Sequence, residues 1–201
     1  MLSLGDRQKK LLLETARRAM IAAVQGSQPL VIPPADPSDD DSLRRPGGAF
    51  VTLHRESHLR GCIGQLPGEE PLIDVVAHCA GMAALEDPRF RPVTPEELAS
   101  VYIEISVLSV PHDVAPQDIV PGTHGLLVSR ASQRGVLLPQ VATRFGWSAL
   151  RFLEETCVKA GLEPHAWKDP ETRVQAFTAE IFSERDSRAG EPLKESYSIS
   201  T

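Results

Sequence analysis

Apolar residues recur at helical spacing in three parts of the chain. In each part they fall on one face of a helix, while charged and polar residues fall on the opposite face. Pro71 opens the second segment at a position where proline is favoured, and Ser148 precedes the third segment as a helix cap. Gly161 follows the third segment and is typical of a helix end. The pattern predicts amphipathic helices over residues 6–24, 71–86 and 149–160.

Alternation of apolar and polar residues predicts β-strands in the remaining segments. Two pairs of such strands flank short polar turns and are predicted to form hairpins, and residues 140–145 are predicted to continue the second hairpin. Thr94 and Glu97 have the spacing of a capping box at the start of a short helical turn. The predicted strands cover residues 49–53, 59–64, 101–109, 124–128, 135–139 and 174–183.

The two halves of the chain repeat one arrangement. Each has a hairpin followed by a helix with an inward cysteine, Cys79 in the first half and Cys157 in the second, and a glycine follows each cysteine closely. This repetition fits a duplicated strand and helix unit. The proline-rich residues 26–48 are predicted to connect elements within one domain. We therefore expect an α+β domain over residues 6–184, either single or in two lobes, followed by a polar, disordered tail over 185–201.

Composition and charge narrow the class of function. The chain has 201 residues, of which 41% are hydrophobic and 24% charged, which is ordinary for a globular protein. The formal net charge of -6 argues against a general nucleic-acid binder, because such binding depends on clustered lysine and arginine. No run of eighteen apolar residues and no signal-peptide pattern is present, so we expect a cytoplasmic protein that does not enter a membrane. The three widely spaced cysteines favour reduced thiols over a disulfide framework.

The densest chemistry lies in residues 59–64, the sequence LRGCIG. On an extended strand Arg60 and Cys62 share a face roughly 6 to 7 Å apart, so the cation is expected to lower the pKa of the thiol. Gly61 and Gly64 permit backbone conformations, or a close approach of another group, that a Cβ atom would forbid. The alternative is a glycine-containing sheet edge whose cysteine is simply buried.

A metal site is the weaker interpretation of this region. His54 and His58 precede Cys62 in sequence, but the two histidines are predicted to lie in a turn and not on one face of a helix. Three local candidates do not make a converging tetrahedral set. We therefore expect solvated turn histidines and no metal.

A series of motifs runs in order along the chain from about Arg7 to Glu184, at residues 50–53, 59–64, 87–90, 103–108, 124–126, 137–142 and 157–162. Together these motifs resemble the AMMECR-type domain family, whose bacterial and archaeal members are called AmmeMemoRadiSam system protein A. The resemblance implies two strand and helix repeats around a single barrel-like, mostly antiparallel sheet. It also implies two partners, a Memo-like protein with a fold similar to extradiol dioxygenases and a radical SAM protein, but it supplies no settled reaction.

One class of function that fits these residues is an enzyme, or a component of one, that uses a thiol. Cys62 would attack an acyl or other electrophilic centre. Glu104, an acid on the polar face of its strand, and His124 are the candidate catalytic partners of that thiol. We expect the reaction to need no cofactor.

The candidate substrate-binding residues surround the same motif. Arg60 would hold an anionic group through two hydrogen bonds, and the backbone near Gly61 and Gly64 could accommodate an oxyanion. Arg89 and Gln140 lie in motifs that match the family and are further candidates for binding an unknown small molecule or peptide. The alternative function is a non-catalytic scaffold for the Memo-like and radical SAM partners, in which Arg60 contacts an anionic partner and the neighbouring cysteine is only a small buried residue.

Overall fold

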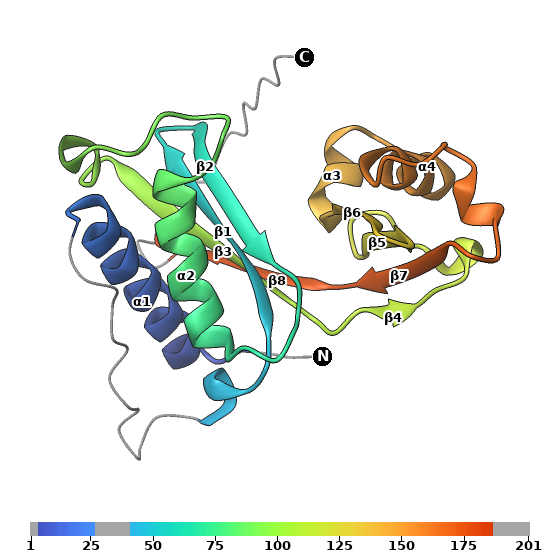
Figure 1. Cartoon of the computed structure of the whole chain (residues 1–201). Coiled ribbons are helices and arrows are strands. Elements are labelled where there is room, and N and C mark those ends of the chain that lie inside the picture. Colours follow the sequence, from blue (N-terminus) through green and yellow to red (C-terminus); the bar gives the residue numbers. More distant parts are fainter. Residues whose placement is uncertain (1–3, 27–40, 187–201) are drawn as a thin grey trace. The chain divides into compact units, whose positions relative to one another are not determined.

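The computed structural model describes residues 4–26 and 41–186 of the chain. These residues form two compact units (Figure 1). The first unit comprises the described residues up to Val107 and those from Glu180 onward, and the second unit is Leu108–Ala179. Most of the predicted connection over 26–48 and nearly all of the predicted tail over 185–201 lie outside the described residues.

The first unit is a four-stranded sheet with two helices on one face, and its strand order is β2-β1-β3-β8. β1 and β2 form the predicted hairpin, and their antiparallel register pairs Thr52 with Cys62. The elements of the unit are α1 (Asp6–Val24), η1 (Asp41–Arg44), β1 (Gly48–Arg55), β2 (His58–Gln65), α2 (Leu72–Leu85), η2 (Pro95–Glu97), β3 (Val101–Leu108) and β8 (Ala179–Ser183).

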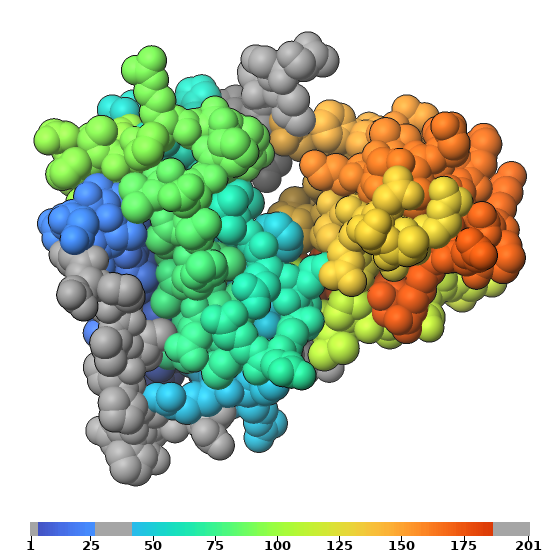
Figure 2. All heavy atoms as spheres, in the orientation of Figure 1, coloured from blue at the N-terminus to red at the C-terminus, as the bar shows by residue number. Residues whose placement is uncertain are grey.

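The core of the first unit lies between this sheet and the helices. Val51 and Leu53 of β1 and Ile103 and Ile105 of β3 are fully buried, together with the apolar stripes of α1 and α2. These residues alternate along their strands, which is why one face of the sheet receives the helices. Figure 2 shows the atoms of α1 packed directly against those of α2. The opposite face carries the alternate residues of the same strands, many of which are polar.

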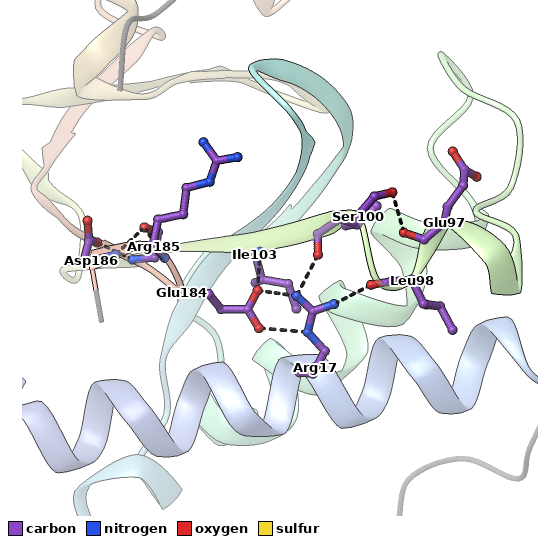
Figure 3. A network of polar contacts seen from close by, with 10 residues as sticks. Arg17, Glu97, Leu98, Ser100, Ile103, Glu184, Arg185 and Asp186 are labelled. Atoms are coloured by element: carbon purple, nitrogen blue, oxygen red, sulfur yellow. Dashed lines mark hydrogen bonds and ion pairs between the residues drawn. The ribbon is translucent and has the colours of Figure 1, made fainter. Parts of the chain in front are cut away.

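A partly buried ion pair ties α1 to the sheet of the first unit (Figure 3). Arg17 donates to both carboxylate oxygens of Glu184 and to the carbonyl oxygens of Leu98 at 3.1 Å and Val101 at 2.8 Å. The Glu184 carboxylate also accepts from the backbone N–H of Ile103 at 2.8 Å. Every acceptor around the guanidinium therefore belongs to β3, to the segment before it, or to the end of β8. A groove of about 1190 Å³ runs beside this network along α1 and β8.

The second unit is an antiparallel sheet of order β4-β7-β5-β6 with helices packed on it. β5 and β6 form the second predicted hairpin. Phe152, Leu153 and Cys157 of α4 are completely buried against the sheet, and the Ser148 hydroxyl caps this helix as predicted. The elements are β4 (His112–Asp113), η3 (Pro116–Asp118), β5 (Gly125–Arg130), β6 (Gln133–Leu137), α3 (Pro139–Arg144), α4 (Ala149–Lys159), η4 (Ala166–Lys168) and β7 (Arg173–Phe177).

Three predictions about the strands require correction. The single barrel-like sheet is not found: the described strands form two separate sheets, and the edge strands of the first, β2 and β8, do not pair to close it. The predicted last strand over 174–183 is interrupted at Thr178, so that β7 joins one sheet and β8 the other. Residues 140–145 do not continue the second hairpin but belong mostly to α3, because Pro139 starts a helix at a favoured position.

Candidate functional site

Cys62 lies on β2 with its side chain on the sheet face opposite α2. A Cβ atom on Gly61 would point at the carbonyl oxygen of Ala83 in α2, so the next residue along the strand faces the other way. The Cys62 thiol is half-buried. The Thr52 hydroxyl, directly across the hairpin, donates to Sγ at 3.3 Å. This thiol therefore lies outside the hydrophobic core, whereas Cys79 and Cys157 lie within the cores of the two units.

One ion pair from the turn after α2 holds the backbone of Cys62. The Asp87 carboxylate accepts the Cys62 N–H at 2.8 Å, the Arg89 N–H at 3.1 Å and two bonds from the Arg89 guanidinium at 2.7 and 2.9 Å. The same guanidinium contacts the Cys62 carbonyl oxygen at 3.4 Å and interacts with the Cys62 side chain. Because β2 is an edge strand, the pair occupies the place that a neighbouring strand would otherwise take.

The environment of Cys62 favours the neutral thiol. Burial raises the pKa of Cys62, and the charges of Asp87 and Glu104 act in the same direction. The Thr52 hydroxyl and the Arg89 guanidinium lower this pKa, but they do not outweigh burial. The expectation of a lowered pKa is therefore wrong. The cation beside the thiol is Arg89 from the turn, and not Arg60 from the same strand.

Arg60 is directed away from the thiol by a β-bulge. The hairpin register shifts between Leu53 and His54, which leaves Arg60 as the extra residue on β2 and breaks the simple alternation of faces. Its guanidinium donates to the Glu97 carboxylate at 2.9 and 3.1 Å and to the carbonyl oxygens of Arg91 and Pro92. The pKa of Glu97 is lowered to about 2, mainly by the bonds from Arg60 and also by the Thr94 N–H and the charge of Arg55. Glu97 thus binds Arg60 and also forms the predicted capping box with Thr94. The structure confirms that capping box.

The two glycines of the motif provide space for close packing. A Cβ atom on Gly61 would lie 2.1 Å from the Ala83 carbonyl oxygen, and one on Gly64 would lie 2.1 Å from the Phe50 ring. Gly61 therefore lets α2 approach the sheet, and Gly64 lets Phe50 cover the strand. The prediction that these positions accommodate groups that a Cβ would exclude is confirmed. Their role in binding a substrate stays a prediction.

Glu104 contributes to a polar cluster on the same sheet face. Its Oε1 lies 3.9 Å from Nε2 of His54, and its charge acts on Cys62. His54 is 2% exposed and stacks on the Tyr102 ring with the centroids 4.9 Å apart. The Arg185 guanidinium lies over the same ring at 3.8 Å. The sequence interpretation of His54 as a solvated turn histidine is wrong, because β1 extends to Arg55 and includes it.

His124 and Gln140 belong to the second unit. His124 precedes β5, where its Nδ1 accepts the backbone N–H of Val120 at 3.2 Å, and its ring makes an edge contact with His112. The side-chain oxygen of Gln140 is buried and has no hydrogen-bond partner among the described residues. The catalytic role of His124 and the binding role of Gln140 stay predictions.

Sequence reasoning missed two residues that contact Cys62, Thr52 and Asp87, although the sequence contains an indication of each. Thr52 follows from the hairpin, because an antiparallel register places it opposite Cys62. Asp87 and Arg89 are two residues apart around a proline, a spacing that lets the carboxylate bind both the backbone and the side chain of the arginine. What could not be read from sequence is that this turn would lie along the edge of β2.

Metal-binding and membrane-spanning features were sought in residues 4–26 and 41–186. Histidine, cysteine and acidic side chains do not gather there in groups of three or more as they would around a metal ion. Within the same ranges, no helix combines the length and the apolar character needed to cross a membrane.

The fold makes the chain a two-unit α+β protein. A model of the AMMECR1 family matches residues 13–182, and the chain belongs to this family. It is 46% identical over 188 residues to a protein of Methanothermobacter thermautotrophicus, covering 90% of this chain and 96% of the relative. It is 41% identical over 199 residues to Protein TK0174 of Thermococcus kodakarensis, covering 94% and 96%.

A solved structure has the same fold. The crystal structure of the uncharacterized protein PH0010 from Pyrococcus horikoshii matches with a TM-score of 0.81 and 37% sequence identity, covering 90% of this chain and 93% of that one. Since the match spans nine-tenths of this chain, it extends over parts of both units.

Proposed function

We propose that the first unit carries a thiol active site centred on Cys62, in an enzyme or in a component of one. The observation that supports this most strongly is the Asp87–Arg89 pair, which holds both backbone groups of Cys62 and places a guanidinium beside its thiol. An ion pair built on a buried carboxylate is unusual at the edge of a sheet, where solvation of the strand would suffice. The other two cysteines have no such setting and are completely or almost completely buried.

The proposed reaction begins from a neutral thiol. The Cys62 proton passes to a base, for which the nearby Glu104 carboxylate is the candidate, and Sγ forms a bond to an electrophilic carbon of the substrate. At a carbonyl carbon the π electron pair moves onto oxygen, and it returns as the leaving group departs with its own bonding pair. Arg89 stabilises the thiolate and the negative charge that follows, and Thr52 orients the sulfur.

The scaffold alternative has less support in the geometry. In that alternative Arg60 contacts an anionic partner, but the guanidinium of Arg60 already donates to Glu97 and to two backbone carbonyl oxygens. Its side chain is also only 14% exposed. From the family resemblance we propose that the thiol site acts together with the Memo-like and radical SAM proteins, which would supply its substrate or consume its product.

The test of this function is a search for turnover. The protein is mixed with its Memo-like and radical SAM neighbours and a pool of cell metabolites, and changes in mass are followed by untargeted mass spectrometry. We expect a metabolite change with the wild-type protein and with Cys157→Ser, and its loss with Cys62→Ser. A turnover that is the same in Cys62→Ser and in the wild type would contradict the proposal.

A further inference from the structure

Arg89 is the exposed member of a pair whose other member is buried. The Arg89 side chain is 55% exposed, and the Asp87 side chain is 2% exposed. Nε and Nη2 of Arg89 are held by the carboxylate, and Nη2 also contacts the Cys62 carbonyl oxygen. The contacts of the described residues leave the Nη1 group without a protein acceptor. The guanidinium is therefore fixed on one edge and open on the other, beside the thiol.

We propose that Arg89 is the anion-binding residue of the Cys62 site, and that the substrate is a small electrophile with a carboxylate or phosphate close to its reacting carbon. This inference rests on the proposed function of Cys62. An arginine oriented by a buried carboxylate presents its free N–H groups in a fixed direction, which suits hydrogen bonds to the oxygens of a carboxylate or a phosphate. A group held there lies close to Cys62, because the same guanidinium contacts the Cys62 carbonyl oxygen at 3.4 Å and its charge acts on the thiol.

Two carboxylates near the thiol oppose the binding of an anion. Asp87 is the smaller obstacle, because it is buried and its oxygens accept four hydrogen bonds from Arg89 and Cys62. Glu104 is the larger one, because its side chain is 21% exposed and its charge reaches Cys62. The selectivity for an anion is therefore the difference between attraction by Arg89 and repulsion by Glu104, and removal of the Glu104 charge is expected to increase it.

The experiment compares two alkylating reagents of the same shape and different charge, iodoacetate and iodoacetamide. Each reacts with the thiolate: the Sγ–CH₂ bond forms and iodide leaves with the bonding pair. The ratio of the two rates at Cys62 is therefore independent of the fraction of thiolate, and any shift in the pKa of Cys62 cancels. The rates are measured on the folded protein by mass spectrometry of the Cys62 peptide, and the ratio for a neutral cysteine model peptide is the reference.

The expected ratio of iodoacetate to iodoacetamide rates at Cys62 is about two- to fivefold above the reference, as for an exposed ion pair. Arg89→Gln should abolish this preference, Arg89→Lys should retain part of it, and Glu104→Gln should enlarge it. Arg55→Gln is the matched control and should leave the ratio unchanged. Arg55 is also an exposed guanidinium paired with a carboxylate, at 51% exposure and 3.1 Å from Glu97, but it does not contact Cys62.

The outcomes separate this inference from the proposed function. A Cys62 that reacts with both reagents but shows the reference ratio, or the same ratio in Arg89→Gln, would overturn the inference and leave the thiol site standing. A Cys62 that reacts with neither reagent would remove the thiol site itself.

If Arg89→Gln fails to fold, inorganic phosphate at constant ionic strength tests the wild-type protein instead. Phosphate should then slow the reaction of Cys62 with iodoacetate more than its reaction with iodoacetamide. If the iodoacetate rate is the same with and without phosphate, the inference is also overturned.

Discussion

Replacing Gly61 with alanine tests whether the motif is built on close contact between β2 and α2. The new Cβ atom would lie 2.1 Å from the carbonyl oxygen of Ala83, whereas real Cβ atoms essentially never approach a heavy atom within 3.0 Å. The obstacle is a backbone atom in the last turn of a packed helix, so no change of rotamer can relieve it. Strand and helix must separate by roughly 1 Å, which opens gaps along the buried stripe of α2.

The expected loss of stability is about 3 kcal/mol, at the upper end of the range for overpacked cores. With a urea dependence of about 2 kcal/mol per molar, the unfolding midpoint should fall by about 1.5 M. Far-UV circular dichroism is the appropriate probe, because α1 and α2 provide much of the helix in the first unit. Both tryptophans, Trp147 and Trp167, belong to the second unit and do not report on this contact.

Gly81→Ala is the matched control, because Gly81 lies in the same helix. Its new Cβ atom would lie 3.4 Å from the Cβ atom of Ala23, which is close to ordinary contact. Alanine is favoured over glycine inside a helix by about 0.5–1 kcal/mol, so the midpoint should stay the same or rise. If Gly61→Ala lowers the midpoint by no more than Gly81→Ala changes it, the argument from close packing is refuted.

Further predictions concern the thiol and two ion pairs. Thr52→Val removes a donor that lowers the pKa of Cys62, so the pH profile of its alkylation should move to higher pH. The Glu97 carboxylate has a folded pKa of about 2 against 4.5 unperturbed, so its contribution to stability is present above pH 4.5 and is lost as the pH falls toward 2. Arg60→Gln should remove most of that contribution, about 2 kcal/mol, and make acid denaturation less steep between these values. Arg17→Met should destabilise the protein by about 2 kcal/mol in thermal or urea unfolding, because it leaves a partly buried carboxylate unpaired.

Regular periodicity made much of the fold predictable. The three helices, both hairpins and the strand over 101–109 follow from the local spacing of apolar residues, and the structure has all of them. The sheet assembly was not predictable in the same way. A single residue, Thr178, separates two strands that belong to different sheets, and nothing in the apolar pattern of 174–183 marks that break.

The candidate site was only partly predictable, for a similar reason. The sequence identified Cys62 as unusual and named Arg89 among the candidates, but it assigned the neighbouring cation to Arg60. That assignment assumed that side chains alternate between the two sheet faces along all of β2. The bulge in the hairpin interrupts this alternation before Cys62. The cation at the thiol instead comes from a turn 27 residues later in the chain, through a hydrogen bond between Arg89 and the Cys62 carbonyl oxygen. Contacts of this kind depend on tertiary packing, which single-sequence patterns do not contain.

The most direct test of the thiol site is the order in which the three cysteines are alkylated in the folded wild-type protein. Iodoacetamide is added at mildly alkaline pH, and mass spectrometry follows each cysteine peptide over time. Cys62 should be modified first, because it is half-buried while Cys79 and Cys157 are 1% and 0% exposed. Its rate should rise with pH around a pKa above that of an ordinary thiol, since burial raises the pKa of Cys62. Equal inertness of all three cysteines until the protein unfolds would contradict a reactive site at Cys62.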